Sequence, residues 1–234
     1  MEERLLEVKN LKVSFNVGKK KLTAVENVEF SLDKGKVIGI VGESGCGKSV
    51  TATSILRLVP PAVSIIDEDS QILFDGEDLV KAPEARMREI RGNEISMIFQ
   101  EPMSALNPSM RIDKQMIETI RLHQDMTKEQ ALAHAADMLK KVGIPDPARV
   151  LKNYPHQLSG GMRQRVMIAM ALACEPDILI ADEPTTALDV TIQAQILELM
   201  QSLQKKLGMA IIMVTHDLGV IADMCDEIIV MYGG

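Results

Sequence analysis

Two kinds of hydrophobic pattern follow one another along the chain. Over residues 11–15 and again over 28–32, apolar side chains alternate with polar ones, as in strands with one face in water. Three lysines at 19–21 separate the two segments and are expected to form a solvated turn. The first part of the chain is therefore predicted to form antiparallel strands.

Five short apolar runs further along show no alternation. A continuously apolar strand is typical of a parallel sheet covered by helices on both faces. Helical patterns lie between the runs, the clearest being an apolar stripe over 192–207 with Asp189 as its N-cap and Gly208 as its end. Strands that alternate with helices predict an α/β fold. The runs are Val37–Val41, Ile95–Phe99, Ile178–Ala181, Ile211–Val214 and Ile228–Met231.

The segment from about 103 to 160 breaks this rhythm and is expected to be a helical insertion into the α/β core. Thr127 and Gln130 form a capping-box pattern at the start of a helix, which Gly143 and Pro145 end. The predicted shared face of this helix consists of Leu132, Ala136 and Leu139.

Composition narrows the classes of function without choosing one. Hydrophobic residues make up 46% of the 234 residues and charged residues 25%, as in an ordinary soluble domain. The net charge of −7 weighs against a nucleic-acid binder, although it allows a local basic patch. The longest apolar stretch, Val166–Cys174, is shorter than the roughly 18 residues of a membrane helix, and no signal-peptide pattern is present. We therefore expect a cytoplasmic protein, either soluble or peripheral to a membrane.

One segment carries a phosphate-binding motif. Gly42–Ser49 matches G-x-x-x-x-G-K-[ST] in full, between an apolar strand and a helical pattern, as the motif requires. Its glycines let backbone N–H groups converge on a phosphate, Lys48 adds positive charge for the outer phosphates, and Ser49 offers a hydroxyl to Mg²⁺. The expected nucleotide-binding residues here are Gly42, Glu43, Ser44, Gly45, Cys46, Gly47, Lys48, Ser49 and Val50.

The motif has an alternative explanation, a glycine-rich turn that arises by chance. It also indicates only a P-loop NTPase and does not separate ATPases, GTPases and kinases. The sequence has no Asn-Lys-x-Asp segment of the kind that reads guanine, which weighs against a GTPase.

Polar groups follow the C-terminal ends of other predicted strands. Gln100 follows one buried run, and Asp182 and Glu183 follow another. Thr215 and His216 follow a third. Because ligands of an open parallel sheet bind beyond these ends, the groups and the phosphate loop are expected to converge on one site. Taken singly, each group could instead belong to an ordinary loop or turn.

Phosphoryl-transfer chemistry suggests a role for each group. Asp182 is placed to hold Mg²⁺ through water, because Mg²⁺ prefers oxygen ligands. Glu183 is expected to orient the attacking water, and His216 to contact the γ-phosphate. Gln100 is expected to complete the metal shell and to report the state of the nucleotide. The predicted catalytic residues are Glu183, His216, Gln100 and Lys48, and the predicted metal ligands are Ser49, Gln100 and Asp182.

One further segment makes the sequence resemble a known family. Leu158–Met162 reads Leu-Ser-Gly-Gly-Met and stands shortly before the Asp182-Glu183 pair. With the phosphate loop and the strand-end groups, in this order over the whole chain, it is similar to the signature loop of the ABC ATPases. The resemblance implies ATP and Mg²⁺ as cofactors and ATP hydrolysis as the activity. It also implies a RecA-like P-loop core with an N-terminal antiparallel β subdomain and an inserted α-helical subdomain.

The resemblance further implies a head-to-tail pair with a second ATPase subunit, identical or related. Ser159, Gly160 and Gly161 would then reach the γ-phosphate held by the second subunit. Residues 186–189 are similar to the family's D-loop, which crosses such an interface and would bring Asp189 to the nucleotide.

Phe15 falls where the family has an aromatic side chain that stacks on adenine, although an ordinary strand residue facing the core would give the same pattern. Two residues depart from the family pattern. Met162 replaces a common glutamine, which puts one contact to the second subunit in doubt. Val50 replaces a common threonine and removes a hydroxyl near the α-phosphate.

Within the family, three segments are similar to the importers of peptides and nickel, most of all to the D-type ATPase of dipeptide and oligopeptide importers. This implies membrane permease subunits, an extracytoplasmic binding protein that acts indirectly, and a place on the inner face of the cell membrane. The solute stays open between peptides and nickel or another small solute. The segments are Phe99–Pro108, Tyr154–Gln157 and Met162–Arg165.

The resemblance predicts one ABC ATPase domain over residues 1–234. Residues 1–102 and 161–234 would form the antiparallel β part and the P-loop α/β core, and 103–160 the helical subdomain with the signature loop at its end. Such members usually continue past the end of this sequence, so a truncated chain or a short relative is expected.

Two other classes of function are weighed against this one. A non-transport ABC ATPase that acts on DNA or ribosomes would carry a long coiled coil or two ATPase domains, whereas the insertion here is short and lacks sustained heptads. A small-molecule kinase would leave Leu158–Met162 unexplained. Stimulation of ATP hydrolysis by membrane subunits, and not by DNA, would separate these classes.

Overall fold

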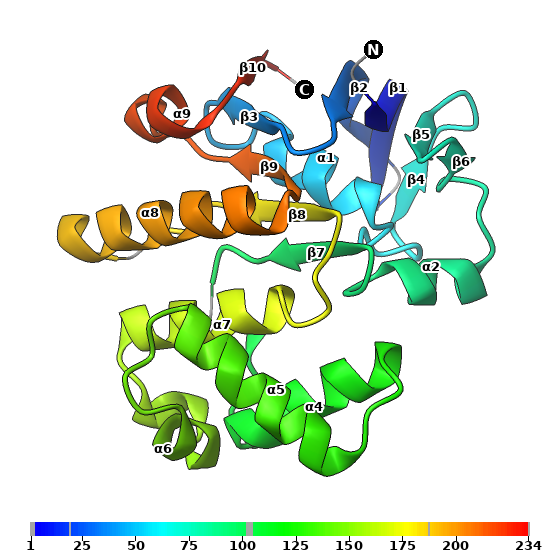
Figure 1. Ribbon diagram of the computed structural model, residues 1–234. Coiled ribbons are helices and arrows are strands. Elements are labelled where there is room, and N and C mark those ends of the chain that lie inside the picture. The colour runs from blue at the N-terminus through cyan, green and yellow to red at the C-terminus, as the bar shows by residue number, and fades with distance from the viewer. Residues whose placement is uncertain (1–2, 19, 102–104, 187, 234) are drawn as a thin grey trace. The chain divides into compact units, whose positions relative to one another are not determined.

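The chain forms two compact units, one of Met1–Arg91 with Gly208–Gly234 and one of Gly92–Leu207. The computed structural model describes residues 3–18, 20–101, 105–186 and 188–233. Each unit has strands and helices of its own (Figure 1).

The first unit contains an antiparallel sheet built around one long strand. β1 (Arg4–Val17) pairs with β2 (Lys20–Asp33), and also with β4 (Ser64–Ile66) and β5 (Gln71–Phe74). The short strand β6 (Glu77–Asp78) pairs with β5. The predicted antiparallel strands are therefore confirmed.

The predicted lysine turn between β1 and β2 is wrong for Lys20 and Lys21. Lys20 and Lys21 are the first residues of β2 and pair with Val17 and Asn16. The chain reverses around Gly18, whose φ of 62° is a left-handed value that glycine adopts at little cost. Lys19 lies outside the described residues. Solvated lysines occur at the ends of strands as well as in turns. The lysines therefore did not show where the chain reverses.

The first unit also contains parallel strands, in which β3 is flanked by β9 and β10. Helix α9 packs closely on β3, since a Cβ placed on Gly39 would lie 2.4 Å from Cδ1 of Ile221. The elements of this part are β3 (Val37–Gly42), α1 (Lys48–Ile55), α2 (Glu84–Ile90), β9 (Ala210–Val214), α9 (Leu218–Met224) and β10 (Glu227–Met231).

Strand β10 differs from the prediction that its run is buried on both faces. Ile228 is 54% exposed and Val230 is 74% exposed, whereas β3 and β9 are almost wholly buried. The strand order ends at β10, so this strand lies at the rim of the sheet. Its apolar composition matches that of a central strand, and the sequence pattern alone did not separate the two positions.

The second unit combines two parallel strands with a group of helices. β7 pairs with β8 in register from Ile95↔Ile178 to Ile98↔Ala181. The helices α4, α5 and α7 pack on one another. The elements of this unit are β7 (Ile95–Ile98), α4 (Ile112–His123), α5 (Lys128–Lys141), α6 (Pro147–Lys152), η1 (Pro155–Gln157), α7 (Gly160–Ala171), β8 (Ile178–Asp182) and α8 (Val190–Leu207).

Helix α5 confirms its predicted start but only one residue of its predicted face, Leu139. The Thr127 side chain accepts a hydrogen bond from the backbone of Gln130, and the Gln130 side chain accepts one from the backbone of Thr127. Leu132 is 40% exposed, however. Apart from Leu139, the buried residues lie one position earlier than predicted, at Ala131, Ala135 and Met138. Small alanines let α5 approach its neighbours closely, so packing selected them over the larger Leu132.

Helix α8 confirms both its predicted stripe and its predicted cap. Ile196, Met200 and Leu203 are buried along one side. The Asp189 side chain accepts a hydrogen bond from the backbone N–H of Ile192 at 3.0 Å, as an N-cap does.

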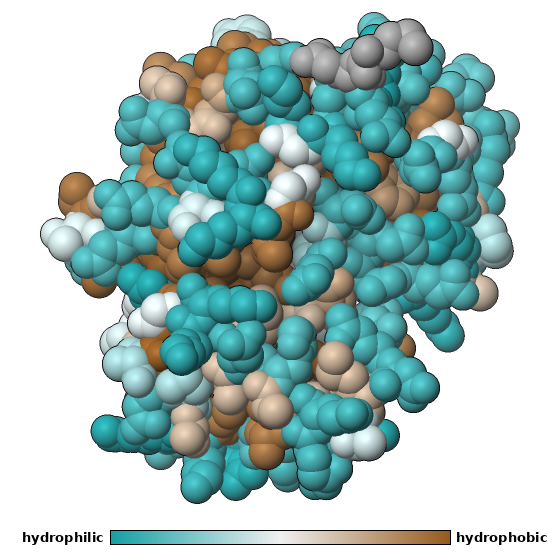
Figure 2. All heavy atoms as spheres, in the orientation of Figure 1, coloured by the Kyte–Doolittle hydropathy of each residue, from teal (hydrophilic) through white to brown (hydrophobic). Residues whose placement is uncertain are grey.

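No helix in the described part of the chain is both long enough and apolar enough to cross a bilayer. Hydrophilic residues predominate on the face shown in Figure 2. The predicted subdomain limits, 1–102 with 161–234 against 103–160, stay a prediction, and their boundary at 102 and 103 falls outside the described residues.

Candidate functional site

The predicted phosphate loop joins β3 to α1 and depends on glycine at its end. Gly47 has a φ of 96°, and a Cβ placed there would lie 2.5 Å from the carbonyl oxygen of Ala24. Any larger residue would therefore meet both backbone strain and a clash with fixed backbone. Gly45 also has a positive φ, 82°, but open space around it. The backbone path of the loop explains the motif's second glycine.

Lys48 is folded back against the loop that precedes it. Its side chain is buried, and Nζ donates hydrogen bonds to the carbonyl oxygens of Gly42 and Glu43, both at 2.9 Å. Its ammonium group is thus held at the loop and not extended into solvent. An ammonium in this place, next to the N-terminal turn of a helix, is suited to an anion.

The remaining residues of the loop vary in exposure. Glu43, Ser44 and Gly45 are exposed, whereas Cys46 is buried. Ser49 is exposed in the first turn of α1, and its carbonyl accepts a hydrogen bond from the Thr53 hydroxyl at 2.7 Å.

The end of β9 lies beside the end of β3, where the phosphate loop begins. Ile40 of β3 is in register with Val214 of β9, and the backbone N–H of Thr215 donates to the Ile40 carbonyl at 3.2 Å. Thr215 is buried, and its hydroxyl accepts from the backbone of Asp217. His216 comes next and is exposed. The first unit therefore brings two of the four predicted strand ends to one edge of its sheet.

Phe15 belongs to the same unit and lies on β1. It is half-buried and pairs across the sheet with Leu22 and Ser64. Its predicted contact with adenine stays a prediction.

The second unit brings the other two strand ends together. The Gln100 side-chain amide donates to Oε2 of Glu183 at 3.0 Å, and the Thr186 hydroxyl donates to the same oxygen at 2.8 Å. Asp182, the last residue of β8, is only 6% exposed. Glu183 has a φ of 45°, a left-handed value that is uncommon for a residue with a side chain. A strained backbone and two hydrogen bonds thus set the direction of this carboxylate.

Sequence reasoning did not anticipate the contact between Thr186 and Glu183. It assigned Thr186 only to a loop similar to the D-loop. It also overlooked the side chain of Gln164, which is buried on α7 and donates to the carbonyl oxygen of Pro184. A polar residue on the apolar side of a helix was the available signal for Gln164. No such signal exists for Thr186, because a hydroxyl three residues from a carboxylate is common.

The predicted signature loop forms the start of α7. The Ser159 hydroxyl accepts a hydrogen bond from the backbone N–H of Met162 at 3.3 Å and caps the helix. Gly161 lies against α8, because a Cβ there would be 3.0 Å from Cγ2 of Ile192. A Cβ on Gly160 would be 3.8 Å from Leu188. Of the segment similar to the D-loop, Ala187 lies outside the described residues.

Each unit therefore assembles half of the predicted site. The first holds the phosphate loop and His216, and the second holds Gln100, Asp182 and Glu183. The expected magnesium ligands are divided in the same way, with Ser49 in the first unit and Asp182 and Gln100 in the second. The convergence of all four strand ends on one place stays a prediction, as do the roles of the individual residues.

Comparisons with known proteins identify the family of the chain. The family model described as "ABC transporter" matches residues 25–186. The chain is 55% identical over 232 residues to the dipeptide transport ATP-binding protein DppD of Bacillus subtilis, covering 99% of this chain and 69% of DppD. It is 54% identical over 231 residues to the oligopeptide transport ATP-binding protein OppD of the same organism, covering 99% of this chain and 64% of OppD. It therefore spans about two thirds of the length of these relatives.

A solved structure has the same fold. It is the dimeric, post-hydrolysis state of the ATP-binding cassette MJ0796 bound to ADP and Pi, with a TM-score of 0.86 and 29% identity, covering 98% of this chain and 95% of that one. The predicted fold class, a parallel P-loop core with an antiparallel β part and a helical part, is confirmed. The chain belongs to the ABC transporter family.

Proposed function

We propose that this chain binds and hydrolyses ATP as the nucleotide-binding subunit of an importer for dipeptides or oligopeptides. The observation that carries the nucleotide part is the phosphate loop, with Lys48 bonded to the carbonyls of Gly42 and Glu43. Peptide transport is supported by the names of relatives that are 54–55% identical to the chain.

In this proposal the first unit binds the triphosphate. Backbone N–H groups of residues 44–49 surround the phosphates. The Lys48 ammonium gives up a hydrogen bond to a loop carbonyl and donates instead to an outer phosphate oxygen. His216 lies at the same edge of the sheet and contacts the γ-phosphate. Phe15 stacks on the adenine, and the backbone of Val50 binds the α-phosphate.

The second unit supplies the hydrolytic group. Glu183 accepts a hydrogen bond from the attacking water and orients it toward the phosphorus. Gln100 and Thr186 both donate to Oε2 of Glu183, which fixes the direction of the carboxylate before water arrives. A carboxylate held in this way needs little reorganisation in the transition state.

Ser49, Gln100 and Asp182 offer the hydroxyl, amide and carboxylate oxygens that Mg²⁺ prefers, so these residues fit the metal. When bound, Mg²⁺ neutralises charge on the phosphates. The buried position of Asp182 suits a carboxylate whose charge is matched by a cation.

A second ATPase subunit, identical or related, completes the site in this proposal. Ser159, Gly160 and Gly161 form an exposed to half-exposed helix start, whose N–H groups suit the γ-phosphate on that subunit. Asp189 lies in the adjacent loop. The determined structure of MJ0796 with ADP and Pi is dimeric, which supports this reading for a cassette of the same fold.

The partners beyond the ATPase pair are membrane permease subunits, and indirectly an extracytoplasmic binding protein. The chain would then be peripheral on the inner face of the cell membrane, with residues 103–160 as the helical subdomain of a single domain. No nucleic acid is expected. Import of nickel or another small solute, and a non-transport role, are not favoured, because DppD and OppD are named for the transport of dipeptides and oligopeptides.

The proposal is tested by reconstitution with peptide permease subunits from the same organism as this chain. ATP hydrolysis by the reconstituted complex should rise when a binding protein loaded with a dipeptide or oligopeptide is added, and Lys48→Ala should abolish the rise. Nickel-loaded binding protein and duplex DNA serve as controls. Stimulation by either control alone would contradict peptide import, and a wild-type chain that does not bind ATP would contradict the nucleotide-binding role.

A further inference from the structure

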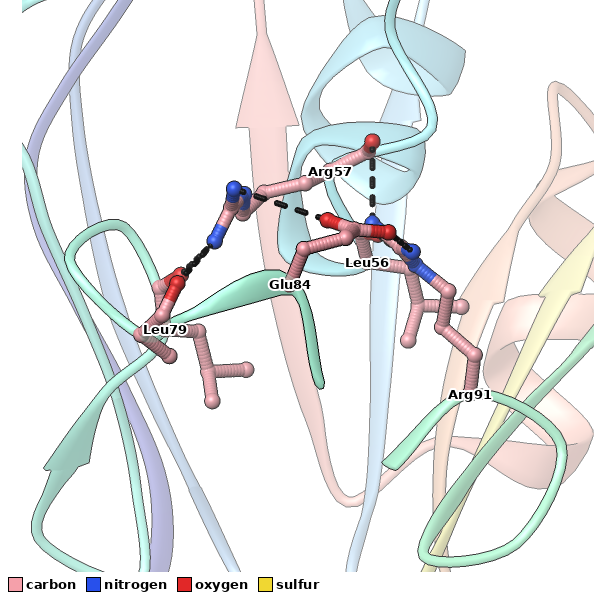
Figure 3. Close-up of polar contacts among 6 residues, drawn as sticks. Leu56, Arg57, Leu79, Glu84 and Arg91 are labelled. Atoms are coloured by element: carbon pink, nitrogen blue, oxygen red, sulfur yellow. Dashed lines mark hydrogen bonds and ion pairs between the residues drawn. The ribbon is translucent and has the colours of Figure 1, made fainter. Parts of the chain in front are cut away.

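A cluster of two arginines and one glutamate lies at the C-terminal end of α1, the helix that begins at the phosphate loop (Figure 3). We call Arg57, Glu84 and Arg91 the arginine cluster. All three residues belong to the first unit. None of them was among the residues predicted for the nucleotide site.

Arg91 binds the backbone at the end of α1. Its Nε donates to the carbonyl oxygen of Leu56 at 2.8 Å, and its Nη2 donates to that of Arg57 at 3.4 Å. The last carbonyls of a helix lack N–H donors within the helix, and a cation at this end also opposes the negative end of the helix dipole. Arg91 thus caps the helix from a distant part of the sequence.

Arg57 holds the chain in an uncommon conformation directly after the helix. Its φ of 51° is left-handed, at a position where glycine is usual. Its guanidinium donates to the carbonyl oxygens of Ala82 at 2.5 Å and Leu79 at 3.3 Å. These contacts secure the end of α1 to the segment before α2.

Glu84 joins the two arginines. Its Oε1 is 2.5 Å from Nη1 of Arg91, and its Oε2 is 3.7 Å from Nη2 of Arg57. The hydrogen bond from Arg91 lowers the pKa of Glu84, and the positive charges of Arg91, Arg57 and Arg88 act in the same direction. The carboxylate is therefore charged at neutral pH and orients both guanidinium groups.

The cluster and the phosphate loop lie at opposite ends of the same short helix. α1 has eight residues, of which Thr51, Ala52, Ser54 and Ile55 are buried along its length. A helix of this length spans only about 12 Å. It therefore moves as one piece, and a change in direction at its end is also a change at its first turn.

We propose that Arg91 is a positioning residue for nucleotide binding. By holding the carbonyls at the end of α1, it sets the direction of the helix whose first turn and preceding loop receive the phosphates. The inference rests on the proposed binding of ATP by this loop. Arg91 is also the last residue of the first unit, from which the chain continues into β7 and Gln100.

The main test compares Arg91→Ala with the wild type in ATP affinity and turnover. We expect the dissociation constant for ATP to rise about tenfold, the effect of losing a charge-assisted hydrogen bond. Turnover at saturating ATP should change less than twofold, because Glu183 is untouched. Arg86→Ala is the matched control, since Arg86 lies on α2, which ends directly before Arg91, and pairs with Glu77 and Glu89. Its ATP affinity should equal that of the wild type.

The variants are expected to fold, because the cluster borders a cavity of about 440 Å³ in which water can reach the freed groups. Melting temperatures identify conditions in which each variant is fully folded. If Arg91→Ala is folded and binds ATP with the wild-type affinity, Arg91 serves stability alone and the proposal is wrong. If the wild type itself fails to bind ATP, the proposed function is wrong instead.

Two further variants separate the carbonyl contacts from the ion pair. Arg91→Lys keeps one donor and should bring ATP affinity back to within about threefold of the wild type. Glu84→Arg combined with Arg91→Glu restores opposite charges but offers no donor to the Leu56 carbonyl, so it should stay as weak as Arg91→Ala. If the double variant bound ATP with nearly the wild-type affinity, the proposal would be wrong.

Amide hydrogen exchange gives a readout that does not depend on activity. Arg91→Ala should speed exchange in the last turn of α1, whereas Arg86→Ala should not. Weak ATP binding with unchanged exchange along α1 would also contradict the proposed positioning role.

Discussion

The predicted site has two halves, which we call half-sites: the phosphate loop in the first unit, and Glu183 with its hydrogen-bond partners in the second. The two half-sites are held in shape by different kinds of contact. In the first unit, the phosphate loop is shaped by backbone geometry, since Gly47 has a left-handed φ and no room for a Cβ. In the second unit, the Glu183 carboxylate is held by the side chains of Gln100 and Thr186. A backbone constraint admits one residue type, whereas a hydrogen bond admits several. The first half-site is therefore the more rigidly specified by sequence.

The largest effect should come from the second half-site. Glu183→Gln keeps the size of the side chain and removes the charge that orients water, so we expect turnover to fall at least about 100-fold. ATP affinity, set by the first half-site, should stay within twofold. Both are measured by steady-state hydrolysis and by equilibrium nucleotide titration. Hydrolysis at the wild-type rate would show that Glu183 does not have its assigned role.

Gly47→Ala tests the backbone constraint of the first half-site. The new Cβ would lie 2.5 Å from the Ala24 carbonyl, so we expect a loss of about 2 kcal/mol or more in the free energy of unfolding and at least tenfold weaker ATP binding. Gly45→Ala is the control, because it has a similar φ but open space, and it should cost only about 1 kcal/mol. Thermal unfolding measures both. Equal losses in the two variants would mean that the clash is not decisive.

Thr186→Val tests the side-chain constraint of the second half-site. The variant removes the hydroxyl that donates to Glu183 at 2.8 Å and should slow turnover about fivefold, in line with about 1 kcal/mol for one hydrogen bond. Thr186→Ser keeps a hydroxyl and should stay close to the wild type. If serine and valine slowed turnover equally, the hydrogen bond would not be the cause.

A last comparison, in which no residue is changed, concerns one thiol in each unit. Burial raises the pKa of Cys174 in the second unit to about 11, and burial followed by the charge of Asp226 does so for Cys225 in the first. At pH 8 each folded thiol should react with iodoacetamide about 100-fold more slowly than in unfolded chain, as followed by peptide mass spectrometry. The stability contributed by the neutral thiols is present below about pH 9 and is lost as the pH rises toward 11. Fast reaction of one thiol would indicate that its surroundings unfold locally and expose it to the reagent.

The sequence was informative where backbone conformation leaves few choices. Gly42–Ser49 revealed the phosphate loop, and the Thr127–Gln130 pair revealed a helix start, because each motif satisfies a fixed geometric need. The family and the fold class followed from such motifs in their order. The parallel direction of β3, β7, β8 and β9 was predicted from their continuously apolar runs, whereas the pairing of β3 with β9 and of β7 with β8 came only from the structure.

Prediction failed where several residues meet the same need. Leu132 was assigned to a buried face, but close packing of α5 selected Ala131 and Ala135. Ile228 and Val230 gave β10 the composition of a central strand at the rim of the sheet. The arginine cluster left no motif, because Arg57 is far in sequence from Glu84 and Arg91 and meets them only through folding.

The hydrogen bond from Gln164 to Pro184 has a consequence for communication within the second unit. Gln164 lies one turn into the helix that Ser159 caps, and Pro184 directly follows Glu183. We therefore expect a displacement at the start of this helix to reach the residue next to Glu183 through one buried amide.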